Sequence, residues 1–120
     1  MGKIVRVDMA TLGIKTEDAP SSFNLLGGRA LTARIVNQEV SPLCHPLSAK
    51  NKLIFAPGLL SGTVIPNSGR ISVGSKSPLT QTIKEANSGG TLGHVLAKLD
   101  IKALVIENKP KENRIYILEV

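Results

Sequence analysis

The sequence of 120 residues predicts an α+β fold, a mixed β-sheet with two helices in a single domain spanning residues 1–120. Three observations lead to this prediction. A chain of this length buries enough surface for one hydrophobic core. Its apolar residues follow a period of two in some segments and a helical period in others. These segments do not alternate strictly, as they would in a doubly wound α/β protein.

The first elements are a predicted hairpin and a brief helical turn. Residues 3–8 alternate polar and apolar side chains, which is typical of a half-buried strand. A turn at 11–13 leads into residues 14–17, so we expect these two segments to pair. Ser21 or Ser22 is placed to cap a helical turn that ends near Leu26.

A helix and a buried strand are predicted next. Residues 29–39 are good helix formers with Ala30, Leu31, Ala33, Ile35 and Val36 on the apolar side, and they predict a helix. Residues 41–50 contain two prolines and are interpreted as a connection. Residues 51–56 form an apolar run of strand length, and we expect it to be buried on both faces of the sheet.

The second half of the chain predicts three strands and one helix. Residues 70–74 alternate like a strand. Residues 92–99 place four apolar side chains on one helical stripe. Residues 103–106 and 114–118 are strand-like, and the proline-containing segment 108–113 between them suits a hairpin loop.

Composition excludes several classes of function. The only cysteine, Cys44, excludes a disulfide framework, a thiolate zinc site and an iron–sulfur cluster built by this chain alone. No apolar run reaches the roughly 18 residues of a membrane span, and the start of the chain does not resemble a signal peptide. We therefore expect a cytoplasmic protein without a membrane partner. The net charge of +6 favours anionic ligands, but with two Phe and one Tyr the chain offers few stacking surfaces for nucleic acid, which is not an expected partner.

The charges are unevenly distributed. No carboxylate lies between Glu39 and Glu85, whereas several cations lie in or at the edge of this stretch: Lys50, Lys52, Arg70, Lys76 and Lys84. The same stretch holds many of the glycines. It is interpreted as a phosphate-facing surface, and the alternative is that loops happen to carry neutral residues.

The candidate site is an anion-binding loop formed by Asn87, Ser88, Gly89 and Gly90 at the predicted start of a helix. Free N–H groups at a helix start attract anions, and glycines let a phosphate approach the backbone. Arg70 supplies a forked donor for the same oxygens. The alternative is an ordinary glycine-rich turn in which Asn87 or Ser88 caps the helix.

Other motifs in the sequence give weaker indications of a functional site. Residues 69–77 space two glycines like a nucleotide-binding loop, but Lys76 comes one residue late and the segment alternates like a strand. Cys44 and His45 are adjacent and lack a third ligand nearby. His94 is expected to be a surface or partly packed residue. No residue is predicted to be catalytic or to bind a metal.

Several blocks of the sequence, in one order, resemble the aldehyde:ferredoxin oxidoreductases, the tungsten-pterin enzyme family. Residues 76–80 and 86–90 resemble the family signature KSPLTG…ANSGG. Residues 26–31 resemble LGGRGL, residues 57–63 resemble GPLTGT, and residues 103–109 resemble AIVVEGK. The likeness extends over nearly the whole chain. It differs at Asp100, Lys102 and Asn108, where the family has glycine, aspartate and glycine.

The resemblance implies a binding role. In this family a tungsten bis-pterin, its phosphates bridged by magnesium, rests on an N-terminal domain of two similar α+β units, and this chain resembles the first unit. Arg70 matches an arginine that contacts the pterin, and Asn87 and Gly89 match residues of the cofactor loop. The family oxidises aldehydes to carboxylic acids and passes electrons through a [4Fe–4S] cluster to ferredoxin.

The resemblance also implies that this chain lacks most of the residues of a complete family member. Family members have several hundred residues, including the cluster cysteines, so we expect this chain to be a fragment or split subunit that is inactive alone. Its expected partner is the remainder of the oxidoreductase, with ferredoxin acting only indirectly. The alternative is a stand-alone, non-catalytic module that forms a homodimer to imitate the missing half. A basic nucleic-acid-binding domain is a third hypothesis.

Overall fold

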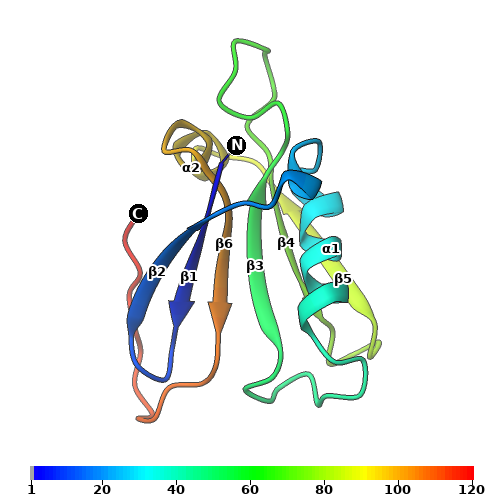
Figure 1. The fold of residues 1–120 in the computed structure, drawn as a ribbon, viewed down its shortest axis with the longest axis vertical. Helices are drawn as coiled ribbons and strands as arrows, with labels where there is room; N and C mark the ends of the chain where they lie inside the picture. Colours follow the sequence, from blue (N-terminus) through cyan, green and yellow to red (C-terminus); the bar gives the residue numbers. More distant parts are fainter. Residues whose placement is uncertain (1) are drawn as a thin grey trace.

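The core of the fold is a six-stranded sheet with the strand order β2-β1-β6-β3-β4-β5, seen in the computed structural model of residues 2–120 (Figure 1). All neighbouring strands are antiparallel except β1 and β6, which are parallel. The predicted α+β class with a mixed sheet and two helices is confirmed. The elements are β1 (Lys3–Asp8), β2 (Gly13–Asp18), the 3₁₀ turn η1 (Ser21–Phe23), α1 (Gly28–Glu39), β3 (Lys52–Pro57), β4 (Ile71–Lys76), β5 (Ile83–Ser88), α2 (Leu92–Lys98) and β6 (Ile101–Glu107).

The predicted hairpin and helical turn near the start of the chain are present. β1 and β2 pair antiparallel, from Lys3 opposite Asp18 to Asp8 opposite Gly13. The turn η1 begins after Pro20, and no side chain caps it. The proposed serine cap is therefore wrong, whereas the helical turn itself is confirmed.

Helix α1 covers one face of the sheet and builds the main core. Its buried residues Leu31, Ile35 and Val36 pack over alternate residues of the strands, as the helical period predicts. The strand residues in this core are Ile4, Ile54, Ala56, Ala103 and Val105. The predicted helix over residues 29–39 is thus confirmed, although Ala30 is exposed.

The opposite face of the sheet carries an apolar row. Cross-strand register places Val5 beside Leu104, Leu104 beside Phe55, and Phe55 beside Val73. Because side chains alternate along a strand, these residues point away from α1. Leu53, two residues before Phe55 and on the same face of β3, is 38% exposed. The expected burial of β3 on both faces is therefore wrong, since α1 covers only one of them.

The end of the chain does not form the predicted hairpin. Residues 103–106 lie in β6 as expected, but residues 114–118 form no strand. β6 is bonded to β1 on one side and to β3 on the other, so no edge is left for a hairpin partner. The segment instead places Tyr116 and Leu118 beside Ile106, around a pocket of about 340 Å³.

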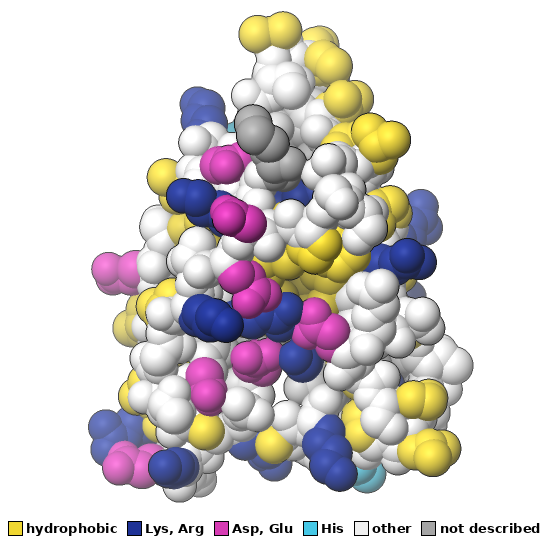
Figure 2. Space-filling view, in the orientation of Figure 1, with side chains coloured by type: hydrophobic (Ala, Val, Ile, Leu, Met, Phe, Trp, Pro, Cys, Tyr) yellow, Lys and Arg dark blue, Asp and Glu magenta, His cyan; other side chains and the backbone are white. Residues whose placement is uncertain are grey.

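Charged side chains form a network on the α1 side of the sheet. Arg6 donates to Glu39 at 2.8 Å and to Glu17 at 2.6 Å. Lys52 donates to Glu39 and to Glu107, each at 2.8 Å. Figure 2 shows acidic and basic side chains intermixed over this part of the molecule. The network joins the end of α1 to β1, β2, β3 and β6.

Candidate anion-binding site

The candidate site lies at one end of the sheet, where several chain segments meet. β3 and β5 end here, β4 begins here, and α1 starts beside them (Figure 1). The loop of residues 58–69 leaves β3, projects beyond the sheet and returns to Arg70. Arg70 pairs the loop with the sheet, because its carbonyl accepts the Gly58 N–H at 3.0 Å.

The side chains of Arg70 and Asn87 are in direct contact. Arg70 Nε donates a hydrogen bond to Asn87 Oδ1. Asn87 Nδ2 donates to Ser72 Oγ at 3.0 Å and to Glu85 Oε1 at 3.1 Å. The amide is therefore fixed in one orientation. No hydrogen bond within residues 2–120 engages the terminal nitrogens of Arg70, which leaves them available for an anion.

The two glycines after β5 keep the space beside Arg70 open. A Cβ on Gly89 would lie 3.8 Å from Arg70 Nη1, so the guanidinium passes over this residue. Gly90 has a φ of +111°, a conformation that favours glycine, and a Cβ there would meet nothing within 4 Å. Ser88 Oγ donates to the Gly89 carbonyl at 3.1 Å. Of the predicted residues, Arg70, Asn87 and Gly89 come together, while Ser88 and Gly90 only flank them.

The secondary structure of this loop differs from the prediction. Asn87 and Ser88 end strand β5 rather than open a helix, and α2 starts only at Leu92. Its N-cap, Thr91, makes no side-chain cap hydrogen bond. The alternative in which Asn87 or Ser88 caps the helix is wrong as well. Pairing of β5 with β4, which sets Ser72 opposite Asn87, is what builds the site.

The start of α1, which was not predicted as part of the site, lies against the same cluster. Gly28 has a φ of +52°, and a Cβ there would be 3.4 Å from Ser72 Oγ. A Cβ on Gly27 would be 2.5 Å from the Leu59 nitrogen, so the glycine pair lets the helix start approach the loop. No side chain caps α1 and its first turn has no acidic residue. The Gly27-Gly28 pair is the sequence feature that could have indicated this close approach.

The electrostatics of the site depend on few groups. Among the cations in or at the edge of the carboxylate-free stretch, Arg70 bonds Asn87, and Lys84 interacts electrostatically with Glu85. Lys52 belongs to the ion-pair network, and Lys76 is buried with its Nζ bonded to the carbonyls of Pro42 and Cys44. Lys52 and Lys76 therefore take no part in the expected phosphate-facing surface.

A carboxylate also lies closer than expected. The hydrogen bond from Asn87 is the main cause that lowers the pKa of Glu85, so this carboxylate stays ionised two residues before Asn87. Asn87 therefore lies between Arg70 and Glu85 and bonds both.

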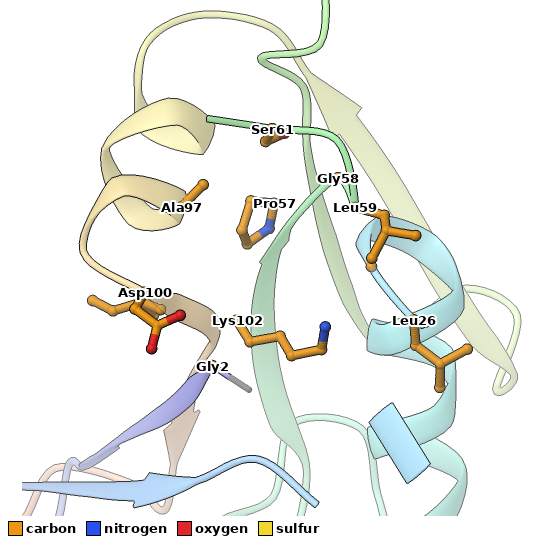
Figure 3. A pocket seen from close by; sticks show the side chains of 11 residues that line it. Gly2, Leu26, Pro57, Gly58, Leu59, Ser61, Ala97, Asp100 and Lys102 are labelled. Atoms are coloured by element: carbon orange, nitrogen blue, oxygen red, sulfur yellow. The ribbon is translucent and has the colours of Figure 1, made fainter. Parts of the chain in front are cut away.

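A pocket of about 160 Å³ adjoins the site between α1, α2 and the end of β3 (Figure 3). The side chain of Lys102 crosses it, and Nζ donates to the Asn24 carbonyl at 3.3 Å. Burial lowers the pKa of Lys102, partly offset by Asp100. These are two of the positions at which the sequence differs from the oxidoreductase pattern.

Metal ligation and membrane insertion find no support in residues 2–120. This part of the chain has no group of three or more His, Cys, Asp or Glu side chains able to hold a metal ion. No helix within it has the length and apolar character of a membrane span. Cys44 is buried and His94 is partly buried, as predicted for His94.

Comparison with known families gives one match that covers nearly the whole chain. Residues 4–119 match the family described as aldehyde ferredoxin oxidoreductase, N-terminal domain.

Curated relatives include tungsten-containing aldehyde ferredoxin oxidoreductases of three archaea. The protein of Pyrococcus furiosus is 42% identical over 118 residues, which are 97% of this chain and 19% of the relative. That of Thermococcus kodakarensis is 38% identical with the same coverage. That of Pyrococcus abyssi is 43% identical over 110 residues, 90% of this chain and 18% of the relative. The chain thus spans about a fifth of the length of these relatives.

A solved structure has the same fold. In the active-site complex of benzoyl-coenzyme A reductase with 1,5-dienoyl-coenzyme A, one chain superimposes with a TM-score of 0.86 and 30% identity. The match covers 92% of the present chain and 17% of that chain. The six-stranded architecture is therefore shared with a part of a much larger protein.

Proposed function

Because the chain belongs to the aldehyde ferredoxin oxidoreductase N-terminal domain family, we propose that it supplies part of the platform that binds the phosphates of a tungsten-pterin cofactor. The observation that carries this proposal is the convergence of Arg70, directly before β4, with Asn87 at the end of β5 and Gly89 in the loop that follows. A guanidinium with free terminal nitrogens beside a glycine backbone is suited to a phosphate.

The residues present fit the phosphate part of such a cofactor. Arg70 would bind phosphate oxygens through its terminal nitrogens, while Asn87 holds its Nε and fixes the plane of the guanidinium. The backbone at Gly89 and Gly90 would take the adjacent oxygens, since no Cβ closes the approach. Ser88 Oγ stabilises the loop by donating a hydrogen bond to the Gly89 carbonyl. Magnesium, when present, would accompany the phosphates, because the described chain has no carboxylate cluster for it.

The redox chemistry belongs to the bound cofactor and to the rest of the enzyme. Once bound, a tungsten-pterin supplies the two-electron oxidation of an aldehyde to an acid. Within the proposal, this chain binds and orients the cofactor and contributes no catalytic residue. An iron–sulfur cluster and electron transfer to ferredoxin would depend on the remaining four fifths of a full-length relative.

Replacing Arg70 with alanine is expected to weaken phosphate binding. Loss of a charge-assisted hydrogen bond costs about 1–3 kcal/mol, or about 5- to 150-fold in the dissociation constant. Isothermal titration of the full chain with inorganic pyrophosphate measures this effect, and cofactor occupancy in a reconstituted full-length complex provides the second readout. Arg34→Ala, an exposed arginine in the middle of α1, is the matched control. Equal pyrophosphate affinity of both variants would refute the assignment of the site.

We further propose that the remainder of the oxidoreductase covers the apolar row on the open face of the sheet. The row of Val5, Leu104, Phe55 and Val73 crosses four adjacent strands. Leu104 is buried and the other three are half-buried, whereas Leu53 on the same face of β3 is 38% exposed. Contiguous apolar surface of this kind marks an interaction site. The relatives have a long additional chain that is able to cover it.

Replacing Leu53 with lysine tests this partner. The full chain is expected to associate with the remaining part of the Pyrococcus furiosus relative, and Leu53→Lys to weaken association by about tenfold or more, as a central apolar contact does. Leu43→Lys, which alters a 93% exposed leucine outside the row, is the control. Light scattering of the chain alone should give a monomer. A stable homodimer that Leu53→Lys dissociates would instead support the homodimer hypothesis.

A further inference from the structure

The side chain of His94 joins α2 to the projecting loop of residues 58–69. Its Nδ1 accepts a hydrogen bond from the Gly62 N–H at 3.1 Å. Gly69 lies so close to the imidazole that a Cβ there would be 2.3 Å from Nε2. The ring thus contacts both arms of the loop, one through a hydrogen bond and the other through van der Waals packing.

The same loop leads directly into Arg70 and fixes its backbone. The Arg70 carbonyl accepts the Gly58 N–H at 3.0 Å and Ser61 Oγ at 3.2 Å. α2 packs on it from the other side, because a Cβ on Gly93 would be 3.1 Å from the same oxygen. The position of the guanidinium therefore depends on the loop and on its attachment to α2.

The contact requires a neutral imidazole. A backbone N–H only donates, so His94 Nδ1 carries no proton and the ring proton is on Nε2. Residues 58–69 and 88–98 contain no carboxylate that would favour an imidazolium. The charged groups on the elements around the ring are Arg70, directly after the loop, and Lys98, one turn further along α2. Protonating Nδ1 would break the bond to Gly62.

We propose that His94 is a positioning residue for the anion-binding site, which orients Arg70 by anchoring the loop of residues 58–69 to α2. The anion-binding part rests on the function proposed above. The anchoring itself rests on the contacts of His94 with Gly62 and Gly69. This bond is the only side-chain hydrogen bond between the loop and α2 within residues 2–120.

Hydrogen exchange followed by NMR in the full chain, without ligand, tests the anchoring. His94→Ala is expected to lower the protection factors of the Gly62 amide and of Arg70 Nε–H by about tenfold, because the loop opens locally. His94→Asn keeps an acceptor near the position of Nδ1 and should retain most of the protection. Unchanged protection of Arg70 Nε–H in His94→Ala would overturn the proposal.

Sulfate binding at pH 7.5 separates this role from the proposed function. The wild type and His94→Asn should bind sulfate equally, and His94→Ala about fivefold more weakly, the effect of one hydrogen bond of ordinary strength. If Arg70→Ala and the wild type bind sulfate equally, the anion site is wrong, while the exchange data still decide whether His94 orients Arg70. If sulfate binding requires Arg70 but is the same in His94→Ala, the positioning role is wrong.

A second variant guards against misfolding of His94→Ala. Gly62 has a φ of +80°, and a Cβ there would be 2.8 Å from the Ala97 Cβ. Gly62→Ala should therefore displace the loop from α2 with His94 intact, and should reproduce the loss of protection at Arg70 Nε–H. Wild-type protection in this variant would contradict the proposed link between loop and guanidinium.

Discussion

Replacing Gly74 with alanine is expected to lower the free energy of unfolding by about 3 kcal/mol, the upper range for overpacking a core. Gly74 lies in β4 directly beneath α1. A Cβ there would be 2.5 Å from the Thr32 Cβ and 2.7 Å from Thr32 Oγ1, distances that no real packing tolerates. Thr32 is fully buried on the rigid backbone of α1, so neither side can yield without moving the helix away from the sheet.

Urea unfolding monitored by circular dichroism measures this loss. Gly89→Ala is the matched control, because its Cβ would make only ordinary contact, at 3.8 Å from Arg70 Nη1. It should change the stability by less than about 0.5 kcal/mol, like other substitutions away from packed sites. Adding Thr32→Gly to Gly74→Ala should recover part of the loss, less about 1 kcal/mol for glycine in a helix. No recovery in the double variant would refute the assigned clash.

Segments whose own pattern determines their structure were predictable. The period of two in residues 3–8 gave a strand, and the helical stripe of residues 29–39 gave α1. Both patterns depend on one buried face and one exposed face within a single segment. The class of fold follows from these elements alone.

Features that depend on strand order were not predictable. Residues 114–118 alternate as well as residues 3–8 do, yet they form no strand. The difference lies in the insertion of β6 between β1 and β3, which leaves β6 without a free edge for a strand that follows it in a hairpin. The exposure of Leu53 has the same origin, since local sequence does not reveal how far other elements cover each face of β3.

The candidate site was predicted as a set of residues but not as a structure. Arg70, Asn87 and Gly89 do lie together, which the predicted anion-binding loop and the resemblance both indicated. Their framework is a polar edge strand whose sequence, IKEANS, has no apolar alternation. Its strand character comes from pairing with β4, and so the predicted helix start was wrong. Ser72, which bonds the Asn87 amide, had no signal in the sequence.

Replacing Arg6 with glutamine is expected to cost about 2–3 kcal/mol of the free energy of unfolding at pH 7. Arg6 donates to Glu17 and Glu39 and lies 3.4 Å from Glu107. Removing one partner from a buried ion pair costs about 3–5 kcal/mol because the other charge remains unpaired. The lower value expected here reflects the partial exposure of the carboxylates, which lets solvent screen them. Lys52 would remain as the principal partner of Glu39 and Glu107.

The effect of Arg6→Gln should depend on pH in a defined direction. The hydrogen bond from Arg6 is the main cause that lowers the pKa of Glu39 to about 2, from a usual value of 4.5, and it lowers the pKa of Glu17 too. A carboxyl group whose pKa is lower in the folded than in the unfolded protein stabilises the fold at pH values above its unfolded-state pKa. This stabilisation is lost as the pH falls through the folded-state pKa. The wild type should therefore lose stability between about pH 5 and pH 2 more steeply than Arg6→Gln does.

Urea unfolding of both proteins at several pH values decides whether charge is the cause. The difference in stability should be largest above pH 5 and should shrink towards pH 2, where the carboxylates are protonated. Lys15→Gln is the matched control, because Lys15 pairs with Glu17 at 3.5 Å but is 75% exposed. Exposed pairs contribute about 0–1 kcal/mol, so this variant should differ little from the wild type at any pH. A difference for Arg6→Gln that stayed constant from pH 7 to pH 2 would mean that packing of the arginine stem, and not its charge, holds β1 to the end of α1.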